Sequence, residues 1–320
     1  MKYTKLLIGV LAVSLILGSA LLRQPVSAQD EEGIHVITTI YPVYDWILST
    51  LGDNPGDITV EYLLDTGTDL HSFQPTVDDI MHIASCDLFV YVGGESDSWV
   101  RDALSTARSE DLHTLCLLDE LGDAALEEEM VEGMQEEEEE GEEESTPDEH
   151  IWLSLRNAST CITSLCDALS QLDEEHADTY AANAAAYKEK LSALDEAYAK
   201  AVEAGSYDTL LFGDRFPFRY LVEDYGLTYY AAFAGCSAET EASFETIIFL
   251  AKKVDELNLP CIMTIEGSDQ KVAQTIQRST QEGDQEILSL DSMQSASSAQ
   301  KDGYLSIMEE NLATLKEALQ

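Results

Sequence analysis

The sequence predicts an α/β fold made of two lobes, each with a parallel β-sheet, and a long rigid helix that bridges them. Short apolar and β-branched runs alternate with helix-like stretches, which is the pattern of parallel βα units. A helical pattern without Pro or Gly fills residues 174–204, and the alternation resumes beyond it. The length of 320 residues, at roughly 150 residues per domain, fits two such lobes.

The first half of the chain contains the strands of one predicted sheet. Four strand-like runs lie at residues 34–40, 57–64, 87–92 and 115–118. Helical patterns follow the first two, at 43–51 and 76–85. Thr76 and Asp79 have the spacing of a capping box, which marks the start of the second helix. We therefore place an N-terminal α/β lobe at residues 29–173.

A long helix is predicted to link this lobe to a second one. Its apolar positions recur at spacings of three, four or seven: Tyr180, Tyr187, Leu191, Leu194, Tyr198 and Val202. At ~1.5 Å per residue a helix of this length is a rod of roughly 45 Å. We assign residues 174–205 to the linking helix and 206–320 to a C-terminal α/β lobe. Its strands are expected at 209–212, 228–233, 261–265 and 286–290, and its helices at 218–225, 244–257, 271–282 and 304–319.

The N-terminus has the layout of a secretory signal peptide. Lys2 and Lys5 precede an apolar stretch at residues 6–22, and a small-x-small site ends at Ala28. We expect cleavage after Ala28, so that residues 1–28 are removed. The alternative is an uncleaved N-terminal anchor, because a mostly apolar stretch of 17 residues is at the lower edge of the spanning range. Either reading predicts an extracytoplasmic protein associated with the cell envelope.

The charge balance excludes whole classes of partner. The chain has 17 Lys and Arg against 62 Asp and Glu, a net charge of −45. Such a surface repels nucleic acid and anionic lipid. Residues 119–149 hold 17 acidic residues and no Lys, Arg or His, which predicts a mobile surface loop. Two readings stay open: the loop concentrates cations near a cleft, or it is a solvated insert without a function.

The six cysteines do not indicate a metal site by their spacing. None forms a CxxC pair, which argues against a zinc site built from thiolates. Their pairing cannot be deduced from the sequence, although an extracytoplasmic location permits disulfides.

Polar residues that follow predicted strands indicate a metal site. In parallel α/β lobes, ligands collect at the carboxyl ends of the strands. Two imidazoles from the first lobe and several charged groups from the second lie at such positions: His71, His150, Asp214, Arg215, Glu266 and Asp291. Imidazole nitrogens with carboxylate oxygens suit Zn²⁺ or Mn²⁺. The spacing alone is weak evidence, because these residues are far apart in the chain.

Several motifs resemble the metal-binding solute-binding proteins of ABC importers for zinc and manganese. The resemblance covers nearly the whole mature chain and is carried by Ile40-Tyr-Pro42, Gly67-Thr-Asp-Leu-His71-Ser-Phe-Gln-Pro75, Tyr91-Val-Gly-Gly-Glu-Ser-Asp-Ser-Trp99, Asp148-Glu-His150-Ile-Trp-Leu153 and Ala182-Asn183-Ala-Ala-Ala-Tyr187. The two histidine motifs in this order are its most specific part. The resemblance implies two lobes on a rigid helix with one metal ion between them.

The resemblance also implies a ligand set, from which this chain departs at one place. It implies His71, His150, a third residue from the second lobe, and Asp291. The third ligand of the family is a His or Glu three residues before Phe-x-Tyr, and that slot holds Arg215, which cannot bind a cation. Asp214 is the neighbouring alternative, and Glu266 is a further one.

The predicted function is that of an extracytoplasmic binding component of a metal ABC importer. We expect it to capture Zn²⁺, or alternatively Mn²⁺, and to deliver it as a monomer to a membrane permease driven by its ATPase. One alternative is the same scaffold with a non-metal ligand held by Arg215. Another is a zinc hydrolase, against which the absence of an HExxH motif argues. As the binding component of an importer, the protein would bind and release the metal without catalysing a reaction.

Overall fold

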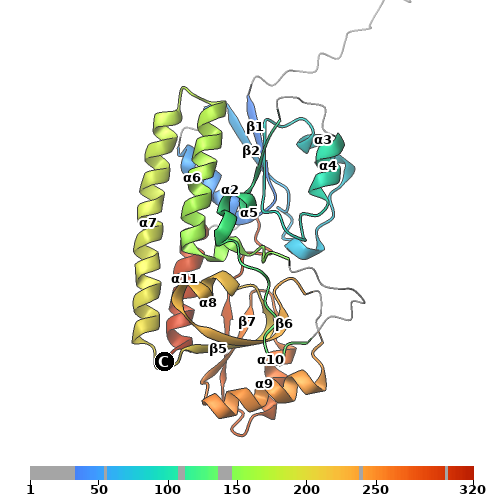
Figure 1. Cartoon of the computed structure of the whole chain (residues 1–320), viewed down its shortest axis with the longest axis vertical. Coiled ribbons are helices and arrows are strands. Elements are labelled where there is room, and N and C mark those ends of the chain that lie inside the picture. Colours follow the sequence, from blue (N-terminus) through green and yellow to red (C-terminus); the bar gives the residue numbers. More distant parts are fainter. Residues whose placement is uncertain (1–32, 54–55, 107–111, 136–145, 238–240, 300–301) are drawn as a thin grey trace, which may run out of the picture. The chain divides into compact units, whose positions relative to one another are not determined.

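The structure of this protein is a computed structural model, shown in Figure 1. It describes residues 33–53, 56–106, 112–135, 146–237, 241–299 and 302–320. The predicted signal peptide and the centre of the acidic segment lie outside these ranges. Within them, no helix combines the length and the apolar character that crossing a bilayer requires.

The first lobe is built on a four-stranded parallel sheet. Its strands are β1 (Ile34–Thr38), β2 (Ile58–Tyr62), β3 (Leu88–Tyr91) and β4 (His113–Cys116), and they lie in the order β2-β1-β3-β4. Its helices are α2 (Tyr41–Leu51), α3 (Val77–Ile83), α4 (Val100–Thr106), α5 (Leu117–Leu121) and α6 (Leu155–Leu172), with short 3₁₀ turns η1 (Leu70–Ser72), η2 (Gly122–Ala124) and η3 (Ile151–Leu153). The predicted capping box of α3 is confirmed, because Thr76 and Asp79 each accept the other's backbone N–H.

The second lobe repeats the same strand order. Its strands are β5 (Thr209–Phe216), β6 (Thr228–Ala234), β7 (Cys261–Ile265) and β8 (Glu286–Leu290), and they lie in the order β6-β5-β7-β8, all parallel. Its helices are α8 (Arg219–Tyr225), α9 (Phe244–Leu257), α10 (Lys271–Ser279) and α11 (Tyr304–Ala318). The two-lobed, parallel-sheet fold predicted from the sequence is thus confirmed. In both lobes the carboxyl ends of the strands carry the loops that hold polar residues.

The linking helix is α7 (Ala177–Ala204), and it runs alongside both lobes in Figure 1. Its buried side chains recur every three or four residues: Tyr180, Ala184, Tyr187, Leu191, Leu194, Tyr198 and Ala201. This apolar stripe packs on α2 and α6 of the first lobe and on α8 and α11 beyond them. Tyr187 donates to Asp45 of α2, and Tyr198 donates to the carbonyl of Met308 in α11. The helix is therefore attached to both halves by packing and by hydrogen bonds.

The apolar core is continuous between the lobes. One cluster of buried side chains includes Val36 and Val90 of the first sheet, Phe212 and Met263 of the second, and the stripe of α7. Two smaller clusters of buried apolar side chains cover the other face of each sheet. One lies between the first sheet and helices α3 and α4, and the other lies between the second sheet and helices α9 and α10. Each sheet is thus buried on both faces, which is usual for parallel sheets.

The acidic segment 119–149, predicted as a mobile loop, has defined contacts at both ends. Its first residues complete α5, and Glu127 pairs with Pro147 in an antiparallel bridge. The backbone N–H of Gln135 donates to Ala232 at the edge strand β6. The stem of the segment is therefore fixed to the second lobe. The mobility of the remainder stays a prediction, because residues 136–145 lie outside the described ranges.

The structure also differs from the expected elements elsewhere. Helices α4 and α5 were not predicted, and Leu117 and Leu118, which were expected in the fourth strand, belong to α5. The helical stretch that contains Cys161 and Cys166 is part of α6, which Ser154 caps by accepting from Asn157. Strand β5 continues to Phe216, so Asp214 and Arg215 lie within the strand and not after it. The parallel pairing with β6 shifts register between Phe212 and Arg215, which is how the strand accommodates these polar residues.

Candidate metal centre

His71 is held in η1, the turn that follows β2. The side chain of Asp69 caps this turn by accepting the His71 backbone N–H at 3.0 Å. The imidazole is 7% exposed, and its Nδ1 lies 3.0 Å from Glu149 Oε1 and 2.8 Å from Ser96 Oγ. Because a carboxylate is an acceptor, we assign the ring proton to Nδ1, which leaves a lone pair on Nε2.

His150 is fully buried at the start of η3. Asp148 Oδ1 accepts both its backbone N–H, at 2.8 Å, and its ring Nδ1, at 2.9 Å. Burial opposes the charged imidazolium, but the contact with Asp148 outweighs burial and raises the pKa of His150 above its usual value. The proton of the neutral ring therefore lies on Nδ1, and its Nε2 also carries a lone pair.

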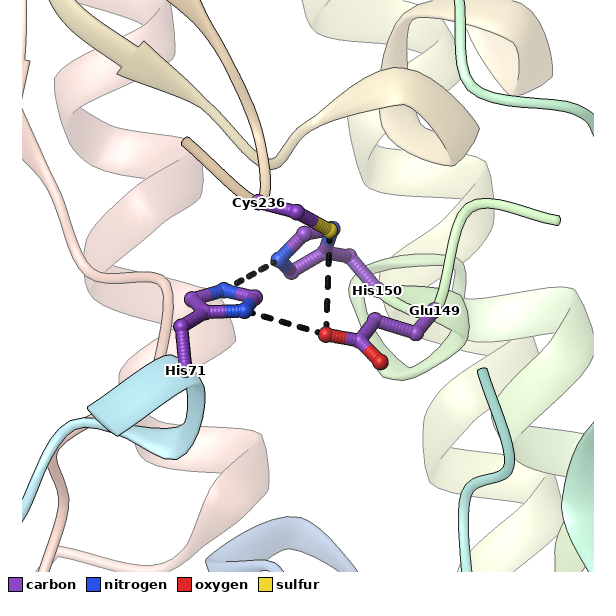
Figure 2. A group of neighbouring side chains, drawn as sticks. All are labelled: His71, Glu149, His150 and Cys236. Atoms are coloured by element: carbon purple, nitrogen blue, oxygen red, sulfur yellow. Dashed lines mark hydrogen bonds and ion pairs between the residues drawn. The ribbon is translucent and has the colours of Figure 1, made fainter. Parts of the chain in front are cut away.

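The two predicted histidines meet across the site. His71 Nε2 and His150 Nε2 are 3.2 Å apart, and Figure 2 shows the two rings facing each other. Tetrahedral Zn²⁺ with bonds of ~2.0–2.1 Å separates its nitrogen ligands by about 3.3 Å. Each histidine also has a carboxylate on its other nitrogen, the arrangement that orients metal-bound histidines in proteins. The pair is therefore set for a shared cation.

Glu149 and Cys236 complete the group drawn in Figure 2. Among the described residues, one ligand atom from each of His71, Glu149, His150 and Cys236 falls within 4.8 Å of the others. The pKa of Glu149 is lowered, because the hydrogen bond from His71 and the charges of both histidines outweigh its burial. Since Glu149 engages Nδ1 of His71 and not the Nε2 side, we interpret it as the group that orients this ring.

Cys236 follows β6 and lies 3.7 Å from Glu149 through its sulfur. Burial and the charges of Glu149 and Glu128 raise the pKa of this thiol far above its usual value. A thiol in this environment stays protonated unless a cation offsets the nearby carboxylates. Cys236 is one of six cysteines with free thiols in the structure.

Two glycines allow this close packing. Gly94 has a positive φ of +87°, and a Cβ there would lie 2.8 Å from Glu149 Oε2. A Cβ on Gly235 would lie 2.9 Å from His150 Cε1 and 2.9 Å from the carbonyl of Phe216. A larger residue at either position would displace a group of the site.

The predicted groups of the second lobe make other contacts. Arg215 donates to Asp69 Oδ2 at 2.7 Å, so the residue in the third-ligand slot forms an ion pair with the first lobe. Asp214 accepts the backbone N–H of Arg215 at 2.9 Å and lies 3.5 Å from the N–H of Ile265. Asp214, Glu266 and Asp291 are not in the group of Figure 2, and their role as ligands stays a prediction.

Glu266 and Asp291 organise the loop after β8. Glu266 accepts from the backbone and the hydroxyl of Ser292, and Asp291 accepts from the backbone of Met293. Burial and repulsion by Asp291 raise the pKa of Glu266 above its usual value. Burial also raises the pKa of Asp291. These carboxylates shape the segment that brings Gln294 to the histidines.

An open cavity gives access to the site. Its volume is about 360 Å³, and it is lined by His71 and Cys236 together with Glu95, Ser96 and Asp102. A cation in solution can approach the His71 imidazole through this acidic opening.

The chain matches the family model described as "Zinc-uptake complex component A periplasmic" over residues 36–318. The chain belongs to this family. It is 31% identical over 293 residues to the zinc-binding lipoprotein AdcA of Streptococcus pneumoniae, covering 90% of this chain and 56% of that relative. It therefore spans little more than half the length of the AdcA relatives it matches. It is also 28% identical over 294 residues to the high-affinity zinc uptake system protein ZnuA of Bacillus subtilis, covering 89% of this chain and 88% of that protein.

Solved structures in the zinc-uptake family agree with the fold. The Zn(II)-bound ZnuA-like domain of S. pneumoniae AdcA superposes with a TM-score of 0.70 at 28% identity, covering 90% of this chain and 99% of that domain. The metal-dependent lipoprotein YcdH of B. subtilis gives a TM-score of 0.72 at 25% identity, covering 89% of this chain and 99% of that chain. These likenesses support the prediction of a family with two lobes and a bridging helix.

Sequence reasoning missed three residues around the histidines. Glu149 lies inside the second histidine motif but was not assigned a role. Cys236 follows β6 and Gln294 lies three residues beyond Asp291, so both fit the rule that loops after parallel strands carry sites. Applying that rule to every strand would have found Cys236. Nothing in the sequence indicates which side chain of the 291–294 loop turns toward the histidines.

Proposed function

We propose that this protein is the extracytoplasmic solute-binding component of an ABC importer for zinc. It captures Zn²⁺ between His71 and His150 and delivers it to a membrane permease that is driven by an ATPase. The observation that carries the proposal is the pair of Nε2 lone pairs 3.2 Å apart, each ring anchored by a carboxylate. The names of the relatives, which describe zinc-binding and zinc-uptake proteins, support the same cargo.

The donor set favours zinc over manganese. Imidazole nitrogen suits Zn²⁺, whereas Mn²⁺ prefers carboxylate, carbonyl and water oxygens. Mn²⁺ remains the alternative cargo if second-lobe carboxylates dominate the site. Of these, Asp291 is the one we propose as a ligand, because the hydrogen bond from Met293 involves only its Oδ1, whereas both oxygens of Glu266 and both oxygens of Asp214 accept hydrogen bonds.

The acidic surroundings fit a cation receptor. The cavity beside His71 carries Glu95 and Asp102, and the chain as a whole has a net charge of −45. The alternative of an anionic ligand held by Arg215 has little support, because this guanidinium is already paired with Asp69. Ligation and release require no catalytic group, so we propose no reaction at this site.

The test is calorimetric titration of Zn²⁺ and of Mn²⁺ into chelator-treated protein. We expect Zn²⁺ to bind more tightly than Mn²⁺, the His71→Ala variant to lose most of this affinity, and Asp214→Ala to change it little. Metal that binds the folded state also raises the melting temperature. A chelator-treated sample whose melting temperature does not respond to added Zn²⁺ or Mn²⁺ would contradict the proposal.

A further inference from the structure

Gln294 brings the second lobe into direct contact with both histidines. Its side-chain Nε2 lies 2.9 Å from His71 Nε2 and 2.5 Å from His150 Nε2. The residue is 2% exposed, and its Oε1 is buried without a hydrogen-bond partner among the described residues. Buried amide oxygens are nearly always satisfied, so an orphaned one at a site of converging ligands needs an explanation.

The amide nitrogen fits the protonation of the two rings. Asp148 and Glu149 hold the ring protons on Nδ1, so both Nε2 atoms present lone pairs toward each other. Two facing lone pairs need a donor or a cation between them. The amide NH₂ of Gln294 has two hydrogens, one for each imidazole.

The three nitrogens also outline part of a metal shell. They form a triangle with sides of 3.2, 2.9 and 2.5 Å. Ligand atoms of a zinc tetrahedron are about 3.3 Å apart, so the histidine pair is already near this separation and the amide would move outward to make room for an ion. A half-turn of the amide about its last side-chain bond exchanges Nε2 for Oε1 with little other movement. The oxygen lone pairs would then face an ion bound to the two histidines.

The backbone of Gln294 is held by hydrogen bonds to one residue of each lobe. Its carbonyl accepts the N–H of Leu70, the residue before His71, at 3.1 Å. Its own N–H donates to Glu266 Oε1 at 3.3 Å. The second-lobe residue in the family's third-ligand slot, Arg215, is instead paired with Asp69. Among the described residues, Gln294 is thus a second-lobe side chain within hydrogen-bond distance of both imidazoles.

We propose that Gln294 is a ligand of the bound zinc through Oε1, and that its NH₂ group holds the two imidazoles at ligating distance in the metal-free protein. This assignment rests on the proposed function. An amide oxygen is a neutral donor, so it binds Zn²⁺ more weakly than a carboxylate at the same position. A glutamine here permits release of the ion to a transport partner.

The experiment compares zinc affinity in four variants of the full mature chain. Zn²⁺ is titrated into chelator-treated Gln294→Ala, Gln294→Glu, His71→Ala and Gln281→Ala, the last being an exposed glutamine of the same lobe. We expect Gln294→Ala to bind zinc about 10- to 100-fold more weakly. Gln294→Glu, which keeps the side-chain shape and adds a charge, is expected to bind more tightly than wild type. Gln281→Ala should match wild type.

Two results would overturn the assignment while leaving the zinc site in place. One is wild-type or tighter zinc binding by Gln294→Ala, with binding lost in His71→Ala, since the amide would then only compete with the ion. The other is a Co²⁺-loaded protein whose visible spectrum is the same in wild type and Gln294→Ala, because removing a ligand changes the cobalt coordination. Failure of the wild-type chain to bind zinc would instead overturn the proposed function and this assignment with it.

Discussion

The two lobes share one topology but use their polar loop residues differently. In the first lobe, His71 and His150 are each fixed by a carboxylate and aim Nε2 at a common point. In the second lobe, Glu266 and Asp291 accept backbone N–H groups of their own loop. The same strand order, β2-β1-β3-β4 and β6-β5-β7-β8, therefore brings residues to the cleft in both halves. The first-lobe histidines therefore present Nε2 lone pairs, whereas the second-lobe carboxylates already take part in the hydrogen bonds of their own loop.

The largest effect is expected from removing a first-lobe imidazole. His150→Ala should weaken zinc binding by about 100-fold or more, because it deletes an Nε2 donor whose outer partners alone are worth about 10- to 100-fold. Zinc titration measures this change. His176→Ala is the matched control, since His176 also contacts an aspartate through Nδ1, at 2.8 Å from Asp173, at the start of α7. If Asp214→Ala cost as much as His150→Ala, the contrast between the lobes would be wrong.

The carboxylate behind His71 should have the next largest effect. Glu149→Gln keeps the shape but weakens the acceptor for Nδ1, so we expect zinc affinity to fall by about tenfold or more. Glu95→Gln removes a charge from the same cavity at an exposed position and serves as the control. Equal losses in both variants would indicate a general electrostatic effect and not orientation of the His71 ring.

The buried carboxyl of Asp97 in the first lobe should make the free energy of unfolding depend on pH. Burial and the charge of Glu149 raise the pKa of Asp97 to about 7, against the two backbone N–H groups that it accepts. Between pH 3.8 and 7 the folded chain keeps a proton that the unfolded chain releases, so the unfolding free energy falls as pH rises. A tenfold difference in proton affinity is about 1.4 kcal/mol, so the fall due to Asp97 should exceed about 1 kcal/mol.

Denaturant unfolding of Asp97→Asn across this range measures that fall. The variant keeps an oxygen that can accept from Val92 and Gly93 but does not titrate, so its unfolding free energy should depend less on pH than that of wild type. Asp102→Asn, on the exposed face of α4, is the control. A pH profile of Asp97→Asn that matches wild type would contradict the assignment.

The smallest effect is expected from the ion pair that joins the lobes. Arg215→Ala removes the partner of Asp69, and we expect the unfolding free energy to fall by about 1 kcal/mol at neutral pH. Burial opposes ionisation of Asp69, but Arg215 outweighs it and holds the pKa of Asp69 below its usual value. This stability is present above pH 3.8 and is lost as the pH falls further, so wild type and variant should converge in acid. The zinc affinity of Arg215→Ala should differ only a few-fold from wild type. If the protein instead bound an anion through Arg215, this variant would no longer bind that anion.

The sequence predicted much of the fold and the first-lobe half of the site. Strand β7 and helix α9 were predicted at the observed residues, because β-branched runs and amphipathic periodicity are local signals. His71 and His150 were found because each lies within a short motif, one after the second strand and one where the acidic segment ends. Their meeting point depends on the packing of two first-lobe segments that are 79 residues apart in the chain, which no local pattern encodes.

The second-lobe half of the site depends on features that the sequence does not display. Arg215 was recognised as unable to bind a cation, but its partner Asp69 is 146 residues away in the chain. Gln294 reaches the histidines after a turn in which Met293 has a φ of +60°. A non-glycine residue in that conformation is uncommon, so a turn at this place is not the expectation from sequence.

The apolar core that the two lobes share beneath α7 limits how far the lobes can move relative to each other. Because one apolar cluster spans both sheets, a large rotation of one lobe against the other would expose buried apolar side chains to water. Under the proposed function, we therefore expect metal binding to change side chains and short loops around His71 and His150 and not the arrangement of the lobes. A permease of the proposed importer would then have to recognise the metal-bound protein by local shape and charge.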